Sequence, residues 1–250
     1  MATVGNSSSR IAAVGRLLAL VGMALGVGSV AAAFVQVISP MAGFGGFALA
    51  MLLSLLALVC SLLGLYSTRA AAGLDGRGDA VSGALVSGSM VVALLVALSG
   101  QGADAPPIND FTTDINDPPV FVKALEDPAN EGNPMAYPGE EFAAQQRQSD
   151  ADLAPLLLTQ PYDLVFDRVQ AALEDLASTT VTDVDRASGR LEASATSSIF
   201  HFVDDVVVRV RAIDEGTQVD VRSRSRDGRG DLGVNAARIR TVLSQVAAGR

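Results

Sequence analysis

The sequence predicts an α+β protein in two parts: three N-terminal transmembrane helices, then a two-layer soluble domain of helix, four-stranded antiparallel sheet and helix. Hydrophobic residues make up 49% of the 250 residues, yet the formal net charge is −9. Dividing the chain resolves this conflict, because residues 1–100 carry four basic and two acidic residues, whereas residues 101–250 carry 14 basic and 25 acidic residues. The apolar mass is therefore N-terminal and the acidic mass C-terminal.

Long uncharged segments predict three membrane spans, at about 17–38, 41–66 and 81–98. A helix needs roughly 20 apolar residues to cross a bilayer core, so all three segments qualify. We therefore assign residues 1–100 to a membrane domain. No acidic, basic or histidine residue lies within the three segments. This disfavours a transporter or pump, because ion and proton pathways usually use such groups.

The arginines around the spans predict the orientation of the chain. Arg10 and Arg16 precede the first span, and Arg69 and Arg77 lie between the second and the third. The positive-inside rule then places the N-terminus in the cytoplasm and the C-terminal domain on the other side of the membrane. We expect a multi-pass protein of a bacterial inner (cytoplasmic) membrane with a periplasmic or otherwise extracytoplasmic domain. A cleaved signal peptide over 10–33 is the alternative, but two further spans follow it.

Residues 101–160 are predicted to form an extended, acidic, proline-rich lead-in. Proline at this density removes backbone donors and forbids long helices. The segment still contains many apolar residues, among them Ile108, Phe111 and Phe121. We therefore expect at least half of it to lie, extended, on the folded domain.

Residues 161–250 are predicted to form the soluble α+β domain. Apolar residues at helical spacing predict one helix from Pro161 to about Ser178 and a second from Leu232, with Asp231 as its N-cap. Between them, period-two patterns separated by glycine turns predict four strands at 181–184, 191–195, 205–213 and 218–225. This order predicts that both helices cover the same face of the sheet.

The alternation along the last two strands predicts one apolar, helix-covered face and one face that carries arginines. Guanidinium groups and the backbone donors of the following helix start are suited to binding an anion or a partner. The candidate binding residues are Arg209, Arg222, Arg224, Arg226, Arg229, Asp231, Asn235 and Arg238. The alternative is that these arginines pair within the domain, with Asp204, Asp205 and Asp220 as candidate partners.

The residues that common catalytic and metal sites require are sparse. The chain has one histidine, His201, and one cysteine, Cys60, so a typical zinc site is excluded, and we expect no metal and no cofactor. The sequence has no Gly-x-Ser-x-Gly elbow, phosphate-binding loop or dinucleotide fingerprint. The acidic domain disfavours nucleic acid as a partner. A serine hydrolase that uses Ser223 or Ser225 with His201 or an acid is a remote alternative.

Three segments resemble the bacterial and plastid family known as domain of unknown function 1499. They are INDFTTDINDPPVF at 108–121, DDVVVRVR at 204–211 and VDVRSRSRDGRGDLGVNAARIR at 219–240. The resemblance covers nearly all of 104–247, and the last motif is long and specific. Similar proteins often have N-terminal membrane spans. The resemblance implies no known activity or substrate.

These observations together predict a membrane-anchored, non-catalytic binding protein. Its extracytoplasmic domain would bind an envelope component or another membrane protein through the arginine-bearing face, in addition to the lipid bilayer that holds the spans. The alternative is a binding domain for a lipid or a small anionic ligand that uses residues 222–238. No oligomeric state is predicted.

Overall fold

The computed structural model describes residues 7–70, 74–98 and 105–249. The chain divides into two compact units, 1–101 and 102–250. The predicted domain boundary between residues 100 and 101 falls outside the described ranges.

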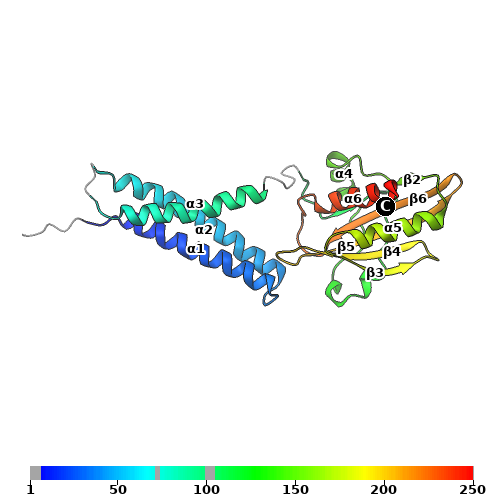
Figure 1. Ribbon diagram of the computed structural model, residues 1–250, viewed down its shortest axis with the longest axis horizontal. Helices are drawn as coiled ribbons and strands as arrows, with labels where there is room; N and C mark the ends of the chain where they lie inside the picture. The colour runs from blue at the N-terminus through cyan, green and yellow to red at the C-terminus, as the bar shows by residue number, and fades with distance from the viewer. Residues whose placement is uncertain (1–6, 71–73, 99–104, 250) are drawn as a thin grey trace, which may run out of the picture. The chain divides into compact units, whose positions relative to one another are not determined.

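The first unit consists of three long helices: α1 (Arg10–Phe34), α2 (Pro40–Ser67) and α3 (Arg77–Leu98), which Figure 1 shows packed together. Each is long and apolar enough to cross a membrane, so the prediction of three such N-terminal helices is confirmed. All three helices begin before the predicted spans, whereas α1 ends at Phe34, four residues before the predicted end at residue 38. Ser9 caps α1 by accepting the Ala12 N–H, and Ser39 caps α2.

Small residues allow these three helices to approach closely. The buried side chain of Ser61 in α2 lies against both Gly15 of α1 and Gly83 of α3, so a Cβ atom at either glycine would collide with it. Such small-residue contacts are a usual basis of helix packing in membranes.

The second unit is built on a six-stranded antiparallel sheet, in place of the four strands predicted. Its strands are β1 (Asp110–Thr112), β2 (Leu156–Leu158), β3 (Thr179–Asp185), β4 (Arg190–Thr196), β5 (Val203–Ile213) and β6 (Gly216–Ser225). The order is β1-β6-β5-β4-β3, and β2 also pairs with β6. The two extra strands come from the lead-in. They have three residues each, which is too short for a period-two pattern to reveal them.

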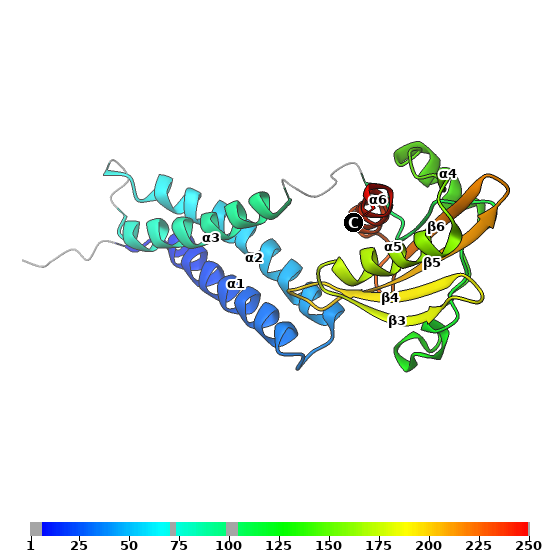
Figure 2. The ribbon, with the colours of Figure 1, turned by 45° about the vertical axis from the view of Figure 1, so that its right-hand side comes forward.

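Two helices, α5 (Tyr162–Asp175) and α6 (Val234–Ala248), cover one face of this sheet, as Figures 1 and 2 show. The predicted α+β class and helix placement are therefore confirmed. The helices and the inward valines of β5 and β6 form the main core. The predicted helix from Leu232 begins two residues later, because Leu232 and Gly233 adopt positive φ angles of 57° and 81°. Asp231 still accepts the N–H groups of Gly233 and Asn235.

The lead-in is less extended than predicted, since it contains a ten-residue helix, α4 (Glu140–Ser149). Prolines do not interrupt this helix; they flank it, at Pro138 and Pro155. Gly139, at φ 87°, turns the chain into its first residue, and two glutamates occupy the first turn, where the helix dipole favours negative charge.

Residues 113–137, which we call the cover segment, lie on the face of the sheet opposite α5 and α6 (Figures 1 and 2). The segment contains two short 3-10 helices, η2 (Ala124–Glu126) and η3 (Pro128–Asn130). Phe121, Ala124 and Met135 pack on Val207 of β5 and form a second, smaller core. The predicted arginine-bearing face is therefore covered by the chain itself.

Candidate functional site

The candidate site is the arginine-bearing face of β5 and β6 together with the cover segment on top of it. Side chains alternate along a strand, so Val219 and Val221 enter the main core while Asp220, Arg222 and Arg224 point to the opposite face. All three of these polar side chains are buried. Burial of charge at this density requires partners for each group.

Arg222 lies at the centre of this face and is only 1% exposed. Its Nε and Nη2 atoms donate to the two carboxylate oxygens of Asp110, at 2.9 and 2.7 Å. The remaining donors reach the backbone carbonyls of Pro119, at 3.2 Å, and Met135, at 3.0 Å. The rings of Phe121 and Tyr137 lie 4.9 and 5.5 Å from the guanidinium carbon. Arg222 thus joins β1 and β6 to two distant points of the cover segment.

Burial dominates the electrostatics around this pair. It raises the pKa of the Asp110 carboxyl, although the hydrogen bonds and charge of Arg222 oppose the shift. The neighbouring Arg224 has less compensation: its nearest carboxylate oxygen, on Asp110, is 3.9 Å away, and its Nη1 donates to the sulfur of Met135. Burial accordingly lowers the pKa of the Arg224 guanidinium.

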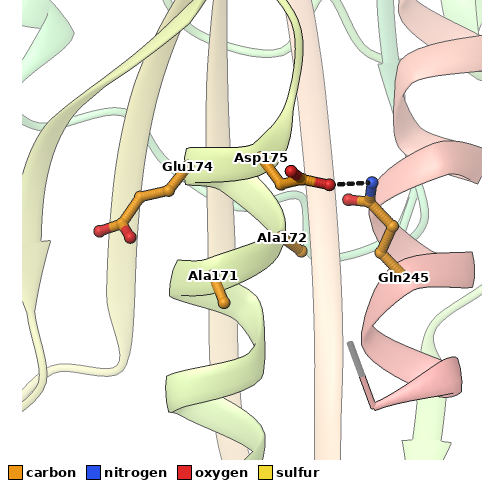
Figure 3. Close-up of a pocket in the computed structure, with 5 residues that line it drawn as sticks. All are labelled: Ala171, Ala172, Glu174, Asp175 and Gln245. Atoms are coloured by element: carbon orange, nitrogen blue, oxygen red, sulfur yellow. Dashed lines mark hydrogen bonds between the residues drawn. The ribbon is translucent and has the colours of Figure 1, made fainter.

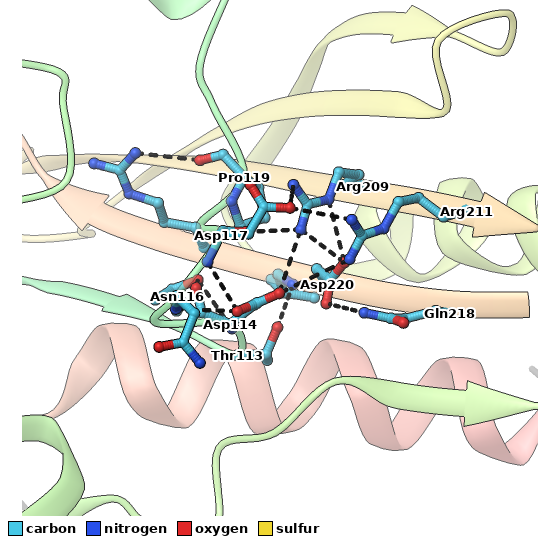
Figure 4. Close-up of polar contacts among 12 residues, drawn as sticks. Thr113, Asp114, Asn116, Asp117, Pro119, Arg209, Arg211, Gln218 and Asp220 are labelled. Atoms are coloured by element: carbon cyan, nitrogen blue, oxygen red, sulfur yellow. Dashed lines mark hydrogen bonds and ion pairs between the residues drawn. The ribbon is translucent and has the colours of Figure 1, made fainter. Parts of the chain in front are cut away.

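Asp220 connects two arginines at another part of the same face (Figure 4). Its buried carboxylate accepts from Arg209 Nη2, at 3.1 Å, and from Arg211 Nη2, at 3.0 Å. Asp117 of the cover segment accepts from the same two arginines, through its carbonyl from Arg209 at 2.7 Å and through its carboxylate from Arg211 at 3.1 Å. Asp114 lies 3.6 Å from Arg209. These arginines therefore fasten the start of the cover segment to the sheet.

Glu192 of β4 has a comparable role that the sequence analysis missed. Its buried carboxylate accepts three consecutive backbone N–H groups of the cover segment, from Val122, Lys123 and Ala124, at 2.7, 2.9 and 2.8 Å. The Nε atom of Arg190 lies 3.1 Å from the same carboxylate. The alternation along β4 could have predicted this position. Leu191 and Ala193 enter the main core, so Glu192 between them lies on the arginine-bearing face, where it pairs with Val207.

Arg226 and Asp205 form the contact beneath η3. The two side chains make a bidentate ion pair, with distances of 2.7 and 3.0 Å, and Asp127 lies 2.8 Å from Arg226 Nη1. Asn130 donates to both Asp205 and the Ala124 carbonyl. The pKa of the Asp127 carboxyl is lowered, mainly because it accepts the N–H of Ala129 and secondly because it accepts a hydrogen bond from Arg226. A pocket of about 230 Å³ opens here; it is lined by Lys123, Ala124, Glu126, Asp127, Pro128, Thr182, Asp205 and Arg226.

The remaining predicted site residues are not on the covered face. Arg238 of α6 pairs with Asp204 at 2.7 Å and donates to Ser223 and Asn235. Ser223 in turn donates to Asn235, which donates to Ser225. The two serines of the remote hydrolase alternative are therefore bonded to an amide. Burial raises the pKa of the Asp231 carboxyl, which caps the turn before α6.

The predicted binding residues thus form three groups. Four arginines, at 209, 222, 224 and 226, lie under the cover segment, and the network around Asn235 joins α6 to β6. Arg229 stands apart: it is exposed on the loop before α6 and forms no ion pair with a described residue. All three predicted structural partners are used, since Asp204, Asp205 and Asp220 pair with Arg238, Arg226 and Arg209, respectively.

A separate groove of about 500 Å³ lies between α5 and α6 and contains none of the predicted residues (Figure 3). Its floor includes Ala171 and Ala172, and Gln245 donates to Asp175 across it at 3.3 Å. Glu174 completes the lining. Within the described ranges, no group of three or more histidine, cysteine, aspartate or glutamate residues is arranged to hold a metal ion.

A model of the family described as "Protein of unknown function (DUF1499)" matches residues 110–246. The matched region starts at the first residue of β1 and ends within α6, so it includes all six strands, the cover segment, α5 and most of α6. No curated protein matches the chain.

Proposed function

The chain belongs to the DUF1499 family, and we propose that it is a membrane-anchored, non-catalytic binding protein whose partner-binding surface is the outside of the cover segment. The partner is a second membrane or envelope protein with an apolar surface strip. Contiguous exposed apolar patches, especially patches rimmed by polar residues, mark such contacts.

One observation carries this proposal: buried charges fix the backbone of a segment that exposes three large aliphatic side chains among its polar ones. Val120, Val122 and Leu125 are 67%, 42% and 57% exposed. Between them, Phe121 and Ala124 anchor the segment in the smaller core. Fixing the backbone in advance reduces the entropy that binding would otherwise cost.

In this proposal the arginines support the binding surface and do not touch the partner. Arg209, Arg222 and Arg226 each contact both the sheet and the cover segment. Displacing the segment to expose them would leave several buried charges without partners, which is unfavourable. A direct anion site has less support for the same reason, and the pocket below η3 is lined by three carboxylates against two basic groups.

The location that we propose follows from the basic residues around the spans. Arg10, Arg16, Arg69 and Arg77 favour a cytoplasmic N-terminus, and three spans then carry the domain to the periplasmic side of a bacterial cytoplasmic membrane. A fusion of alkaline phosphatase to the C-terminus of the full chain should be active. Activity of a cytoplasmic reporter at the same position, such as a fluorescent protein that fails to mature in the periplasm, would show the opposite orientation.

Site-specific crosslinking in cells tests the binding surface. A photoreactive residue is placed at Val120 or Leu125 of the full chain, with Leu157 of β2, which is 63% exposed, as the matched control. We expect the same protein to be captured from both cover positions and not from Leu157. Val122→Asp should abolish that capture without lowering the amount of folded protein. Capture from all three positions, or persistence after Val122→Asp, would refute the proposal.

A further inference from the structure

Two loops lie side by side at one end of the sheet, and neither contributes to the binding surface proposed above. Residues 197–202 join β4 to β5, and residues 226–233 join β6 to α6. Strand pairing brings them together, because Asp204 lies opposite Ser225 and the Arg226 N–H donates to the Val203 carbonyl at 3.0 Å.

Each loop presents a large aliphatic side chain to solvent. Ile199 and Leu232 are both 53% exposed. Just after the second loop, Val234 is 39% exposed. In the same loop, the rings of Phe200 and Phe202 contact each other at a tilt of 49°, with their centroids 6.0 Å apart. This end of the sheet therefore carries apolar residues on two adjacent tips.

The backbone holds these tips in an unusual conformation. His201 and Leu232, one in each loop, have φ angles of 61° and 57°. A leucine rarely adopts the left-handed region, because its Cβ crowds the backbone there. The Asp231 carboxylate imposes it by accepting the N–H groups of Gly233, at 2.9 Å, and Asn235, at 2.7 Å. Outliers of this kind concentrate at functional positions.

The same end of the sheet is where the chain enters the domain. Asn109 donates to the carbonyls of Ser225, at 3.3 Å, and Gly228, at 2.8 Å. Gly230 lies against Pro107. Only residues 99–104 separate Leu98, the last residue of α3, from Ala105. A chain of that length reaches at most about 25 Å, which limits how far Ala105 can lie from the end of α3, a helix apolar enough to span a membrane.

We propose that the loops 197–202 and 226–233 contact the lipid surface of the membrane that anchors the chain, with Ile199 and Leu232 inserted among the lipid headgroups. Binding at a membrane surface combines buried apolar side chains with basic residues at the headgroups, and the exposed Arg229 lies in the same loop as Leu232. Because the exposed Asp227 balances that arginine, the attraction is mainly apolar, and binding should depend little on salt.

The sequence offers a direct test, because the chain contains no tryptophan. Three single-tryptophan variants of the full chain, Ile199→Trp, Leu232→Trp and Ile213→Trp, are reconstituted into phosphatidylcholine vesicles with or without acyl chains brominated near the headgroup. Ile213 is the matched control, since it is an exposed aliphatic residue, 39% accessible, at the opposite end of β5. Eleven residues of strand place that end about 33 Å away.

We expect brominated lipid to quench the emission of the first two variants at least twofold, and to leave Ile213→Trp unchanged. Raising NaCl from 0.1 to 1 M should change the quenching by less than twofold. Unquenched emission at both loop positions, or equal quenching of all three variants, would overturn the proposal.

A second variant separates lipid contact from folding. Leu232→Gly removes the inserted side chain and relieves the left-handed backbone, so the domain should be at least as resistant to urea as before. In the Ile199→Trp background, it should nevertheless reduce the quenching by brominated lipid. Unchanged quenching in a folded Leu232→Gly protein would show that the two loops do not act together on the membrane.

Discussion

The buried pair of Arg222 and Asp110 should respond to mutation in a way that surface ion pairs do not. The two side chains are 2% and 0% exposed, respectively, and they share two hydrogen bonds. We consider Asp110→Asn, Arg222→Met and the double variant. Each single change leaves one member of the pair without its partner in the interior. The double change removes both charges.

The expected magnitudes follow from these contacts. Breaking a buried ion pair costs about 3–5 kcal/mol, because the remaining charge has lost its solvent and its partner. Arg222→Met also frees the carbonyls of Pro119 and Met135, but the residual Asp110 can take up a proton. Asp110→Asn, by contrast, leaves a buried guanidinium without its carboxylate, and guanidinium groups stay charged in proteins. We therefore expect about 3–5 kcal/mol for each single variant, and a double variant that is at least about 2 kcal/mol more stable than the sum predicts.

The pH dependence has a definite sign. Burial raises the pKa of Asp110 above that of the unfolded chain. Its contribution to stability is therefore fully present below about pH 3.9, and it is lost as the pH rises through the folded pKa. Arg222 opposes this rise through its hydrogen bonds and charge. In Arg222→Met the folded pKa of Asp110 should therefore rise further, and stability should fall with pH over a wider range than in the wild type.

Urea unfolding of the full chain in a mild detergent, followed by circular dichroism, measures these differences. Hydrogen exchange resolved by mass spectrometry then shows whether residues 113–137 open first in Arg222→Met. Single variants within about 1 kcal/mol of the wild type would refute the account of a buried, mutually dependent pair. A double variant equal to the sum of the singles would refute it as well.

Three further predictions concern contacts around the cover segment and the β3–β4 turn. Glu192→Gln places an amide donor against backbone N–H donors, so exchange of residues 122–124 should accelerate and stability should fall by about 1–3 kcal/mol; unchanged exchange would contradict this. Asp127→Asn should lower the free energy of unfolding slightly at pH 7, by up to about 1 kcal/mol. Since the folded pKa of Asp127 is lowered, that difference should shrink as the pH falls below about 3.9 and vanish once the pH has passed the folded pKa; a difference that does not shrink with falling pH would have another cause. Gly189→Ala should cost about 2 kcal/mol or more, because its φ is 72° and the new Cβ would meet the Val210 carbonyl; Gly132→Ala, at φ 80° with open space around it, is the thermal-unfolding control and should cost less.

The arginines illustrate what a single sequence can say about a site. The alternation of valine and arginine in β5 and β6 correctly predicted which residues share a face, because side-chain direction has a fixed period of two. It did not predict that Asp110, Asp114, Asp117 and Asp127 would meet those arginines. These four acids precede the strands by about 80 to 115 residues, and no local pattern indicates a contact over such a separation.

The sequence by itself determined the features that local composition and periodicity encode: three helices apolar enough to span a membrane, two amphipathic helices and four alternating strands. Only the tertiary structure decided the position of the lead-in, since β1 and β2 are too short to be recognised without the edge of β6 beside them. It also decided that the arginine-bearing face is internal. The physical reason is that buried guanidinium and carboxylate groups are stable only when a segment supplies hydrogen bonds and opposite charges to them. Which segment does so depends on three-dimensional proximity.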